Sequence, residues 1–271
     1  MARSPRFWPQ SRSQPRSSWA GLGLTLALLL AASSTPPLAQ GLPPYPWPHP
    51  APWVSLPELA RQTTVRILTD SASGSGVLIQ RQGQTYTVLT SWHVLAFSDR
   101  ATLLTPDGRR YGVLRSPRQL GNTDMAIVQF QSAIPYRLAP LKPDPPRLGE
   151  PVYAAGFPMY QDRSLVTTFD QGIHNLRLSQ GIISLLPTKS LPQGYRLGYS
   201  NDVVIGMSGG PIFNSQGLLV GINGRIKDRD PGFGVYAFED GSEPDPALLE
   251  QMLNASWGIP ITTYFQFVPL V

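Results

Sequence analysis

The segment Gly206-Met207-Ser208-Gly209-Gly210-Pro211 has the composition of a turn that exposes a nucleophile. It lies between two β-type runs, so Ser208 would stand on a loop between strands. Flanking glycines let backbone N–H groups approach the negative oxygen that develops when a serine attacks a carbonyl carbon. We expect the N–H groups of Gly206 and Ser208 to be these donors. Taken alone, G-x-S-x-G is a weak motif, because glycine- and serine-rich turns are common.

A serine nucleophile needs a general base, and histidine most often has this role. The chain has three histidines, His49, His93 and His174, and all of them precede Ser208. This order excludes the α/β-hydrolase arrangement, in which the histidine follows the serine. His49 lies in a proline-rich segment, and His174 is predicted to be an ordinary histidine within a β run. His93, at the end of a β run and the start of a helical turn, is the predicted base.

The third residue of such a site is an acid that orients the histidine. Asp124 directly precedes an apolar run, a position that can bury a carboxylate beside the imidazole. Asp99 follows His93 too closely to fold back on it, and Asp107 is explained by an Asp-Gly turn. No acidic residue before His93 has the signature that the opposite order, acid before histidine, would require. The order histidine, aspartate, serine remains.

Short β-type runs separated by turn signals surround these residues and form two sets, joined by the proline-rich segment 139–147. Six strands at this spacing favour a small closed barrel, because closure removes exposed edges. Short helices are predicted at 56–62 and 246–254. The predicted strands are 64–68, 75–80, 85–90, 101–104, 110–115 and 125–129, then 151–156, 173–178, 181–185, 196–200, 211–213, 218–222 and 234–237.

The segments T-S-W-H-V around His93, T-D-M-A-I-V around Asp124 and G-M-S-G-G-P around Ser208 together resemble the trypsin-like serine protease superfamily. In spacing they are similar to the bacterial HtrA-type and related cysteine-free members. The similarity covers roughly residues 58–240 and includes Gly74-Ser75-Gly76-Val77, Gly156-Phe157-Pro158 and Leu219-Val220-Gly221-Ile222-Asn223.

The resemblance implies an all-β, chymotrypsin-like fold of two antiparallel six-stranded β-barrels, with the active site in the cleft between them and a short C-terminal helix. It also implies that His93 deprotonates Ser208, that Asp124 stabilises the imidazolium, and that an acyl-enzyme forms and is hydrolysed.

The residues that bind the substrate are less clearly indicated. By counting back from Ser208, Asp202 resembles the position at the base of the primary specificity pocket. A carboxylate there would pair with a lysine or arginine of the substrate. The alternative is that Asp202 completes a turn with its two preceding neighbours, and that Asn223, Gly224 and adjacent residues line a pocket for small apolar side chains.

Residues 1–39 have the pattern of a signal peptide, with four arginines, an apolar run of 13 residues and small residues before a predicted cleavage site after Ala39. The run is shorter than the roughly 20 apolar residues of a membrane span, although an uncleaved anchor is the alternative. The expected organisation continues with a proline-rich tether at 40–57, the first β-barrel at 58–138, the linker at 139–147, and the second β-barrel with the C-terminal helix at 148–271. With 63 residues after Ser208, no further domain of the PDZ type is expected, because such a domain needs about 90 residues.

Composition narrows the function further. Without the leader's four arginines, 18 Lys and Arg stand against 17 Asp and Glu, so no basic face for nucleic acid is expected. The absence of cysteine excludes disulfides and thiolate metal sites, and in an exported chain it indicates a bacterial envelope or medium. We expect a secreted or periplasmic serine endopeptidase that acts on polypeptides, without cofactor or metal and without membrane contact beyond export. The alternative is a catalytically inactive trypsin-like binding protein.

Overall fold

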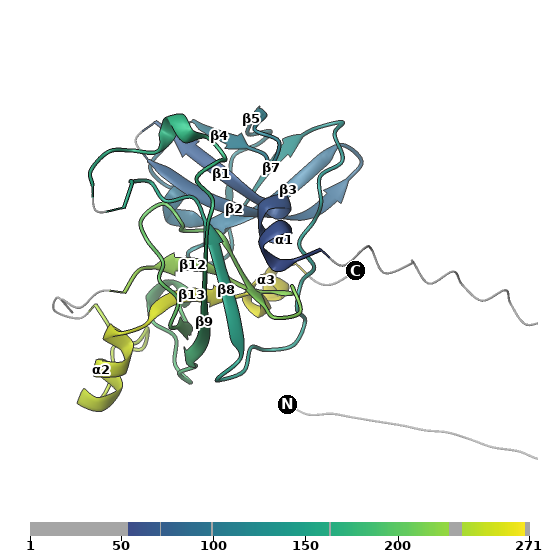
Figure 1. Ribbon diagram of the computed structural model, residues 1–271. Coiled ribbons are helices and arrows are strands. Elements are labelled where there is room, and N and C mark those ends of the chain that lie inside the picture. The colour runs from purple at the N-terminus through teal and green to yellow at the C-terminus, as the bar shows by residue number, and fades with distance from the viewer. Residues whose placement is uncertain (1–53, 71, 99, 163, 228–234, 269–271) are drawn as a thin grey trace, which may run out of the picture. The chain divides into compact units, whose positions relative to one another are not determined.

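The computed structural model describes residues 54–268, except 71, 99, 163 and 228–234. The predicted leader and most of the predicted tether therefore lie outside the described residues. Within the described part, 13 short strands dominate and the helices are short (Figure 1). None of the described helices is long and apolar enough to cross a membrane.

The N-terminal half of this unit is an antiparallel sheet preceded by the helix α1 (Leu56–Thr63). Its strand order is β5-β4-β1-β2-β3-β7-β6. Seven strands thus replace the predicted closed six-stranded barrel. The strands are β1 (Thr64–Thr69), β2 (Ser73–Gln82), β3 (Thr85–Ser91), β4 (Ala101–Leu104), β5 (Arg110–Gly112), β6 (Arg118–Gln119) and β7 (Met125–Gln131).

The first sheet does not close into a full barrel, because the chain after β5 leaves the ladder early. The N–H of Leu114 donates to the carbonyl of Gln129 in β7 at 2.7 Å, so the two ends of the sheet approach each other. Pro117 has no N–H to donate, and it separates this contact from the two-residue strand β6. The result is a strongly curved half-barrel.

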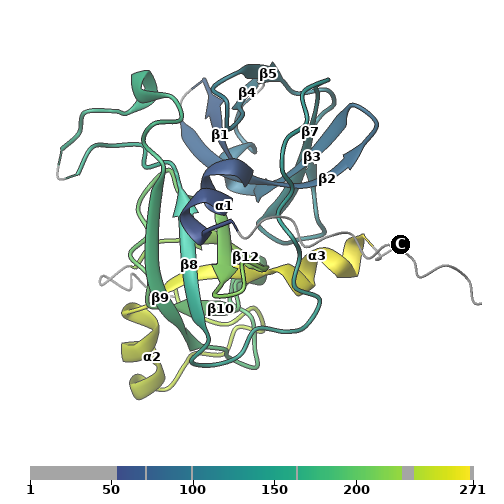
Figure 2. The ribbon, with the colours of Figure 1, turned by 45° about the vertical axis from the view of Figure 1, so that its right-hand side comes forward.

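The C-terminal half contains a closed barrel of six antiparallel strands, as predicted, in the order β10-β13-β12-β11-β8-β9. Its strands are β8 (Pro151–Gly156), β9 (Arg177–Leu185), β10 (Leu197–Tyr199), β11 (Pro211–Asn214), β12 (Leu219–Arg225) and β13 (Ser256–Pro260). The helix α2 (Pro246–Leu253) was predicted, whereas α3 (Ile261–Phe267) was not. In both views α2 lies at the end of this barrel that is remote from the first sheet (Figure 2).

Two details of the predicted barrel are wrong. Residues 173–178 and 181–185 do not form two strands, because β9 is one continuous strand from Arg177. Consequently His174 lies in an exposed turn before β9 rather than within a strand. The described part of 234–237 is also not a strand, and its place in the barrel is taken by β13, which follows α2.

The half-barrel and the barrel share buried apolar contacts. Each has a cluster of its own, and a further cluster joins Leu89 and Met125 of the first sheet to Ile222 and Trp257 of the barrel. Leu89 and Ile222 are both fully buried. Burial of apolar side chains is the main favourable contribution to folding. The shared cluster therefore holds the half-barrel and the barrel against each other.

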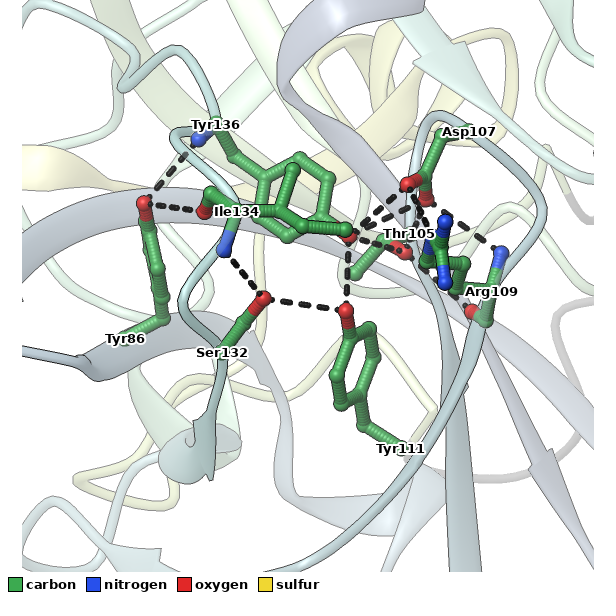
Figure 3. A network of polar contacts seen from close by, with 8 residues as sticks. All are labelled: Tyr86, Thr105, Asp107, Arg109, Tyr111, Ser132, Ile134 and Tyr136. Carbon is green, nitrogen blue, oxygen red and sulfur yellow. Dashed lines mark hydrogen bonds and ion pairs between the residues drawn. The ribbon is translucent and has the colours of Figure 1, made fainter.

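A polar network covers one end of the first sheet (Figure 3). The hydroxyl of Tyr136 donates to both carboxylate oxygens of Asp107, at 3.1 and 3.0 Å. The hydroxyl of Tyr111 lies 2.9 Å from that of Tyr136 and 2.9 Å from that of Ser132. Gly108, which follows Asp107, has a φ of +80°, as the predicted Asp-Gly turn requires. The network fastens this turn to the chain that leaves β7.

Candidate active site

The loop that carries Ser208 runs from β10 to β11 and is held by Ser75 of β2. The N–H of Ser75 donates to the carbonyl of Ser208 at 2.8 Å, and its hydroxyl donates to the carbonyl of Gly206 at 2.9 Å. Gly209 has a φ of +80°, and a side chain there would collide with the carbonyl of Ser75. Gly206 has a φ of +97°. Glycine is therefore needed at both positions, because few other residues adopt such angles.

The backbone N–H groups expected to bind an oxyanion lie on this loop. In the described part of the chain, the N–H groups of Gly206 and Ser208 have no acceptor, whereas those of Met207 and Gly209 donate to backbone carbonyls at 3.0 and 2.8 Å. Uncommitted N–H groups beside a serine hydroxyl could stabilise a negative oxygen without first giving up a bond.

His93 and Asp124 are brought together by two neighbouring strands. His93 lies in the 3₁₀ turn Trp92–Val94 after β3, and Asp124 directly precedes β7, which pairs with β3. Oδ2 of Asp124 lies 2.6 Å from Nδ1 of His93, and Oδ1 accepts the His93 backbone N–H at 2.7 Å. The carboxylate is fully buried, whereas the imidazole is 44% exposed. The acid therefore fixes the inner edge of the ring and leaves Nε2 toward solvent.

Ser208 and His93 line the same pocket, which has a volume of about 400 Å³. The Ser208 hydroxyl donates to the carbonyl of Gly224 at 3.2 Å rather than to the imidazole. A rotation of the serine side chain would be needed to turn the hydroxyl toward His93. The structure thus gathers the three residues predicted from chain order at one place.

Two of the predicted substrate-binding side chains face elsewhere. The carboxylate of Asp202 lies 2.7 Å from Nη2 of Arg177 and borders a neighbouring pocket of about 320 Å³, not the one that Ser208 lines. The side chain of Asn223 is fully buried, where it accepts from the hydroxyl of Tyr199 at 2.8 Å. Gly224 does line the Ser208 pocket. Of the three residues, Gly224 alone lines the pocket of Ser208, and the substrate-binding roles of all three stay predictions.

Two residues of the site had no role predicted from the sequence. Ser75 lies in the G-S-G-V segment, whose resemblance to the family is a signal that could have found it. The hydroxyl of Tyr195 donates to Oδ2 of Asp124. Tyr195 lies 71 residues after Asp124, and no motif in the sequence indicates that the two meet. Among the described residues, no group of three or more His, Asp or Glu could hold a metal ion.

Comparison with known proteins agrees with this geometry. Residues 74–222, more than half of the chain, match the family model of the trypsin-like peptidase domain. The chain therefore belongs to the trypsin-like peptidase family, and the resemblance inferred from the sequence is confirmed.

Several curated bacterial proteins are similar to this chain. It is 30% identical over 205 residues to a probable periplasmic serine endoprotease DegP-like of Ectopseudomonas mendocina. The aligned region covers 73% of this chain and 39% of that relative. It is 28% identical over 207 residues to the putative serine protease HhoA of Synechocystis, covering 68% and 48%. For the serine protease Do-like HtrA of Bacillus subtilis the values are 26% over 198 residues, covering 69% and 40%. The chain thus spans less than half the length of these relatives.

Proposed function

We propose that this chain is an exported serine endopeptidase that hydrolyses peptide bonds with His93, Asp124 and Ser208. The observation that carries the proposal is the contact of 2.6 Å between His93 and the buried Asp124 at the edge of a pocket that Ser208 also lines. Membership of the trypsin-like peptidase family supports the same class of reaction. The leader expected from the sequence and the word periplasmic in a relative's name support export.

The proposed reaction uses Nε2 of His93 and the N–H groups of Gly206 and Ser208. Because Asp124 occupies Nδ1 of His93, Nε2 can accept the proton of Ser208 as its oxygen bonds to the substrate carbonyl carbon. The carbonyl oxygen becomes negative, and the N–H groups of Gly206 and Ser208 stabilise it. Cleavage of the C–N bond then sends the proton from His93 to the leaving amine. Water repeats the sequence on the acyl-enzyme and restores Ser208.

A fluorophosphonate probe tests this function without knowledge of the natural substrate. The folded full-length chain is expected to take up the probe, and mass spectrometry of its peptides should find the probe on Ser208. Ser208→Ala is the matched control, because it removes one oxygen and leaves the loop bonds of Ser75 in place. The variant should take up no probe, and a chelator should not change labelling of the wild type.

Hydrolysis of an unfolded protein such as casein provides the second measurement. Ser208→Ala should lower the rate on the order of 10³-fold or more, while the fold is retained. Unchanged hydrolysis in a clean preparation of the variant would contradict the mechanism. A folded wild type that neither binds the probe nor cleaves casein would favour the alternative, a catalytically inactive trypsin-like binding protein.

A further inference from the structure

The carboxylate of Asp124 is shared between the two halves of the protein. His93, from the first sheet, contacts both of its oxygens. Tyr195, from the loop before β10, donates its hydroxyl to Oδ2, the same oxygen that faces Nδ1 of His93. Because Asp124 is fully buried, hydrogen bonds from protein groups replace the water that a carboxylate needs.

The phenol of Tyr195 is held in one position by its surroundings. Its side chain is 1% exposed, and the guanidinium of Arg225 lies over the ring at 4.5 Å from the centroid. On another side lies Gly224, where an added Cβ would collide with the ring. Any larger residue at 224 would therefore displace Tyr195 from Asp124.

The loop that carries Tyr195 also binds the backbone of Asp124. The N–H of Asp124 donates to the carbonyl of Gln193 at 2.8 Å. Gln193 has a φ of +68°, which is unusual for a residue other than glycine and costs conformational energy. The N–H of Leu191 donates to the carbonyl of Tyr195 at 2.8 Å and closes the loop. One tight loop of the second half thus fixes both the main chain and the side chain of Asp124.

We propose that Tyr195 is a positioning residue of the active site, which orients the carboxylate of Asp124 toward His93, and that Gly224 provides the space for its ring. This inference rests on the proposed function, because the orientation matters only if His93 acts as a base. Burial, and then the charge of Asp124, raise the pKa of the Tyr195 hydroxyl far above its ordinary value, so the group stays a donor at every working pH.

Tyr195→Phe removes the hydroxyl and keeps the ring that fills the space beside Gly224. The rate constant of fluorophosphonate labelling at Ser208 should fall by about 10- to 100-fold, since a hydrogen bond to a charged group is lost. Tyr195 borders the Ser208 pocket but is 1% exposed. The probe concentration at half-maximal rate should change little, because the ring that borders the pocket is kept in Tyr195→Phe. The acid limb of the pH profile should move to higher pH, since Oδ2 without the phenol attracts the charged imidazole more strongly.

Tyr136→Phe is the matched control, because Tyr136 also donates to an aspartate but lies in the network of the first sheet (Figure 3). It should leave the labelling rate and its pH profile unchanged. Equal rates and equal profiles for wild type and Tyr195→Phe would overturn the positioning role while leaving the proposed function intact. A wild type that takes up no probe would instead contradict the proposed function itself.

Replacement of Tyr195 by 3-fluorotyrosine at this one position gives a test that keeps both ring and hydroxyl. The fluorinated phenol is a stronger donor, so the acid limb should move to lower pH, opposite to the shift in Tyr195→Phe. This variant also decides the matter if Tyr195→Phe does not fold. An unmoved acid limb in the fluorinated protein would overturn the proposal.

Discussion

Two tyrosine–aspartate pairs in this protein share the same chemical groups and differ in burial and in the basic side chain beside the carboxylate. In the first sheet, Asp107 accepts from Tyr136, from the hydroxyl of Thr105 at 2.6 Å and from the backbone N–H of Arg109 at 3.3 Å. The guanidinium of Arg109 lies 3.2 Å from the same carboxylate, whose side chain is 35% exposed. All of these donors come from one corner of one sheet.

The pair of Tyr195 and Asp124 is buried and joins both halves of the chain. In the described residues, His93 is the basic side chain within ion-pair distance of Asp124. The charge of Asp107 is thus balanced by an arginine that is always protonated, whereas Asp124 faces a histidine that takes up the proton of Ser208 in the proposed reaction. A buried carboxylate can therefore orient a histidine where no arginine neutralises it, whereas a carboxylate paired with an arginine has a structural role.

Loss of charge should affect hydrolysis very differently at the two aspartates. Asp124→Asn should lower peptide hydrolysis by about 10⁴-fold, because the amide favours the wrong tautomer of the histidine and leaves its charged form unpaired. Asp107→Asn should leave hydrolysis unchanged, since its network does not touch the site. Casein hydrolysis by both variants, matched for folding by circular dichroism, measures the difference.

Similar activity in Asp124→Asn and Asp107→Asn would contradict the different roles given to the two aspartates. If both retained wild-type rates, Asp124 would have no greater role than Asp107. A tenfold loss in Asp107→Asn would instead show that the first-sheet network is coupled to the site.

The buried tyrosines, including the one in each pair, should also affect alkaline stability, and this effect is smaller. Burial is the largest cause that raises the pKa of Tyr195 and of Tyr199. A group whose pKa is raised by folding stabilises the protein fully below its unfolded pKa, here about 10, and this contribution is lost as the pH rises above that value. Each such tyrosine should lower the free energy of unfolding by about 1.4 kcal/mol per pH unit above pH 10.

Urea unfolding at several pH values between 9 and 11.5 measures this slope. Tyr195→Phe should make it shallower by the contribution of one tyrosine. Tyr136→Phe should make it shallower by a similar amount, because burial, and then hydrogen bonds with Tyr111 and Asp107, raise the pKa of Tyr136 well above its ordinary value. Equal slopes in the wild type and Tyr195→Phe would mean that Tyr195 ionises in the folded state.

Chain order and local pattern point to His93, Asp124 and Ser208, which the structure places around one pocket and whose catalytic roles stay a proposal, but they do not indicate what holds the three residues there. His93, Asp124 and Ser208 each lie beside a strand with a clear β pattern, so their elements could be located. Tyr195 follows a Pro-Gln-Gly turn that carries no periodic signal. Its contact with Asp124 depends on the absent side chain of Gly224, which is a three-dimensional condition that spacing along the chain does not express.

The fold was predictable to a similar degree. The closed second barrel was expected, but β13 was missed because its sequence, Ser-Trp-Gly-Ile-Pro, combines glycine and proline with few β-formers. It is a strand because its partners β10 and β12 flank it and its residues are all buried. Pairing with neighbouring strands and burial thus make β13 a strand, although its own sequence does not favour one.

Acid stability should show a still smaller difference at Asp107. Burial raises the pKa of this carboxyl, but hydrogen bonds from Thr105, the Arg109 backbone and Tyr136 outweigh it, so the net pKa lies below the ordinary value. A lowered pKa stabilises the fold above the unfolded value of about 3.9, and this contribution is lost as the pH falls through the folded value.

Asp107→Asn should therefore lower the free energy of unfolding at pH 7 by less than about 1 kcal/mol, because the side chain is partly exposed and solvent screens it. Urea unfolding at pH 7 and at pH 2.5 measures the difference, which should nearly vanish at the lower pH. A loss that is equally large at both pH values would show that shape, not charge, explains the role of Asp107.

A third carboxylate, that of Asp202, gives the smallest expected effect. Its charge is paired with Arg177 at 2.7 Å and its side chain is 66% exposed, so it resembles Asp107 more than Asp124. Although the sequence assigns Asp202 to a pocket for basic side chains, its carboxylate borders a different pocket from Ser208.

We expect Asp202→Ala to change kcat/KM for any peptide by less than about twofold, because exposed ion pairs contribute little. Arg225→Ala is the matched substitution, since Arg225 does line the Ser208 pocket. It should lower cleavage of every peptide to some extent, because its guanidinium also lies over the ring of Tyr195. The loss should be largest for peptides with acidic side chains near the scissile bond. Profiling the wild type and both variants on one peptide library decides between the two residues. If the wild type cuts after lysine and arginine and Asp202→Ala loses that preference, the carboxylate reaches the substrate despite Arg177, and the assignment made from the sequence holds.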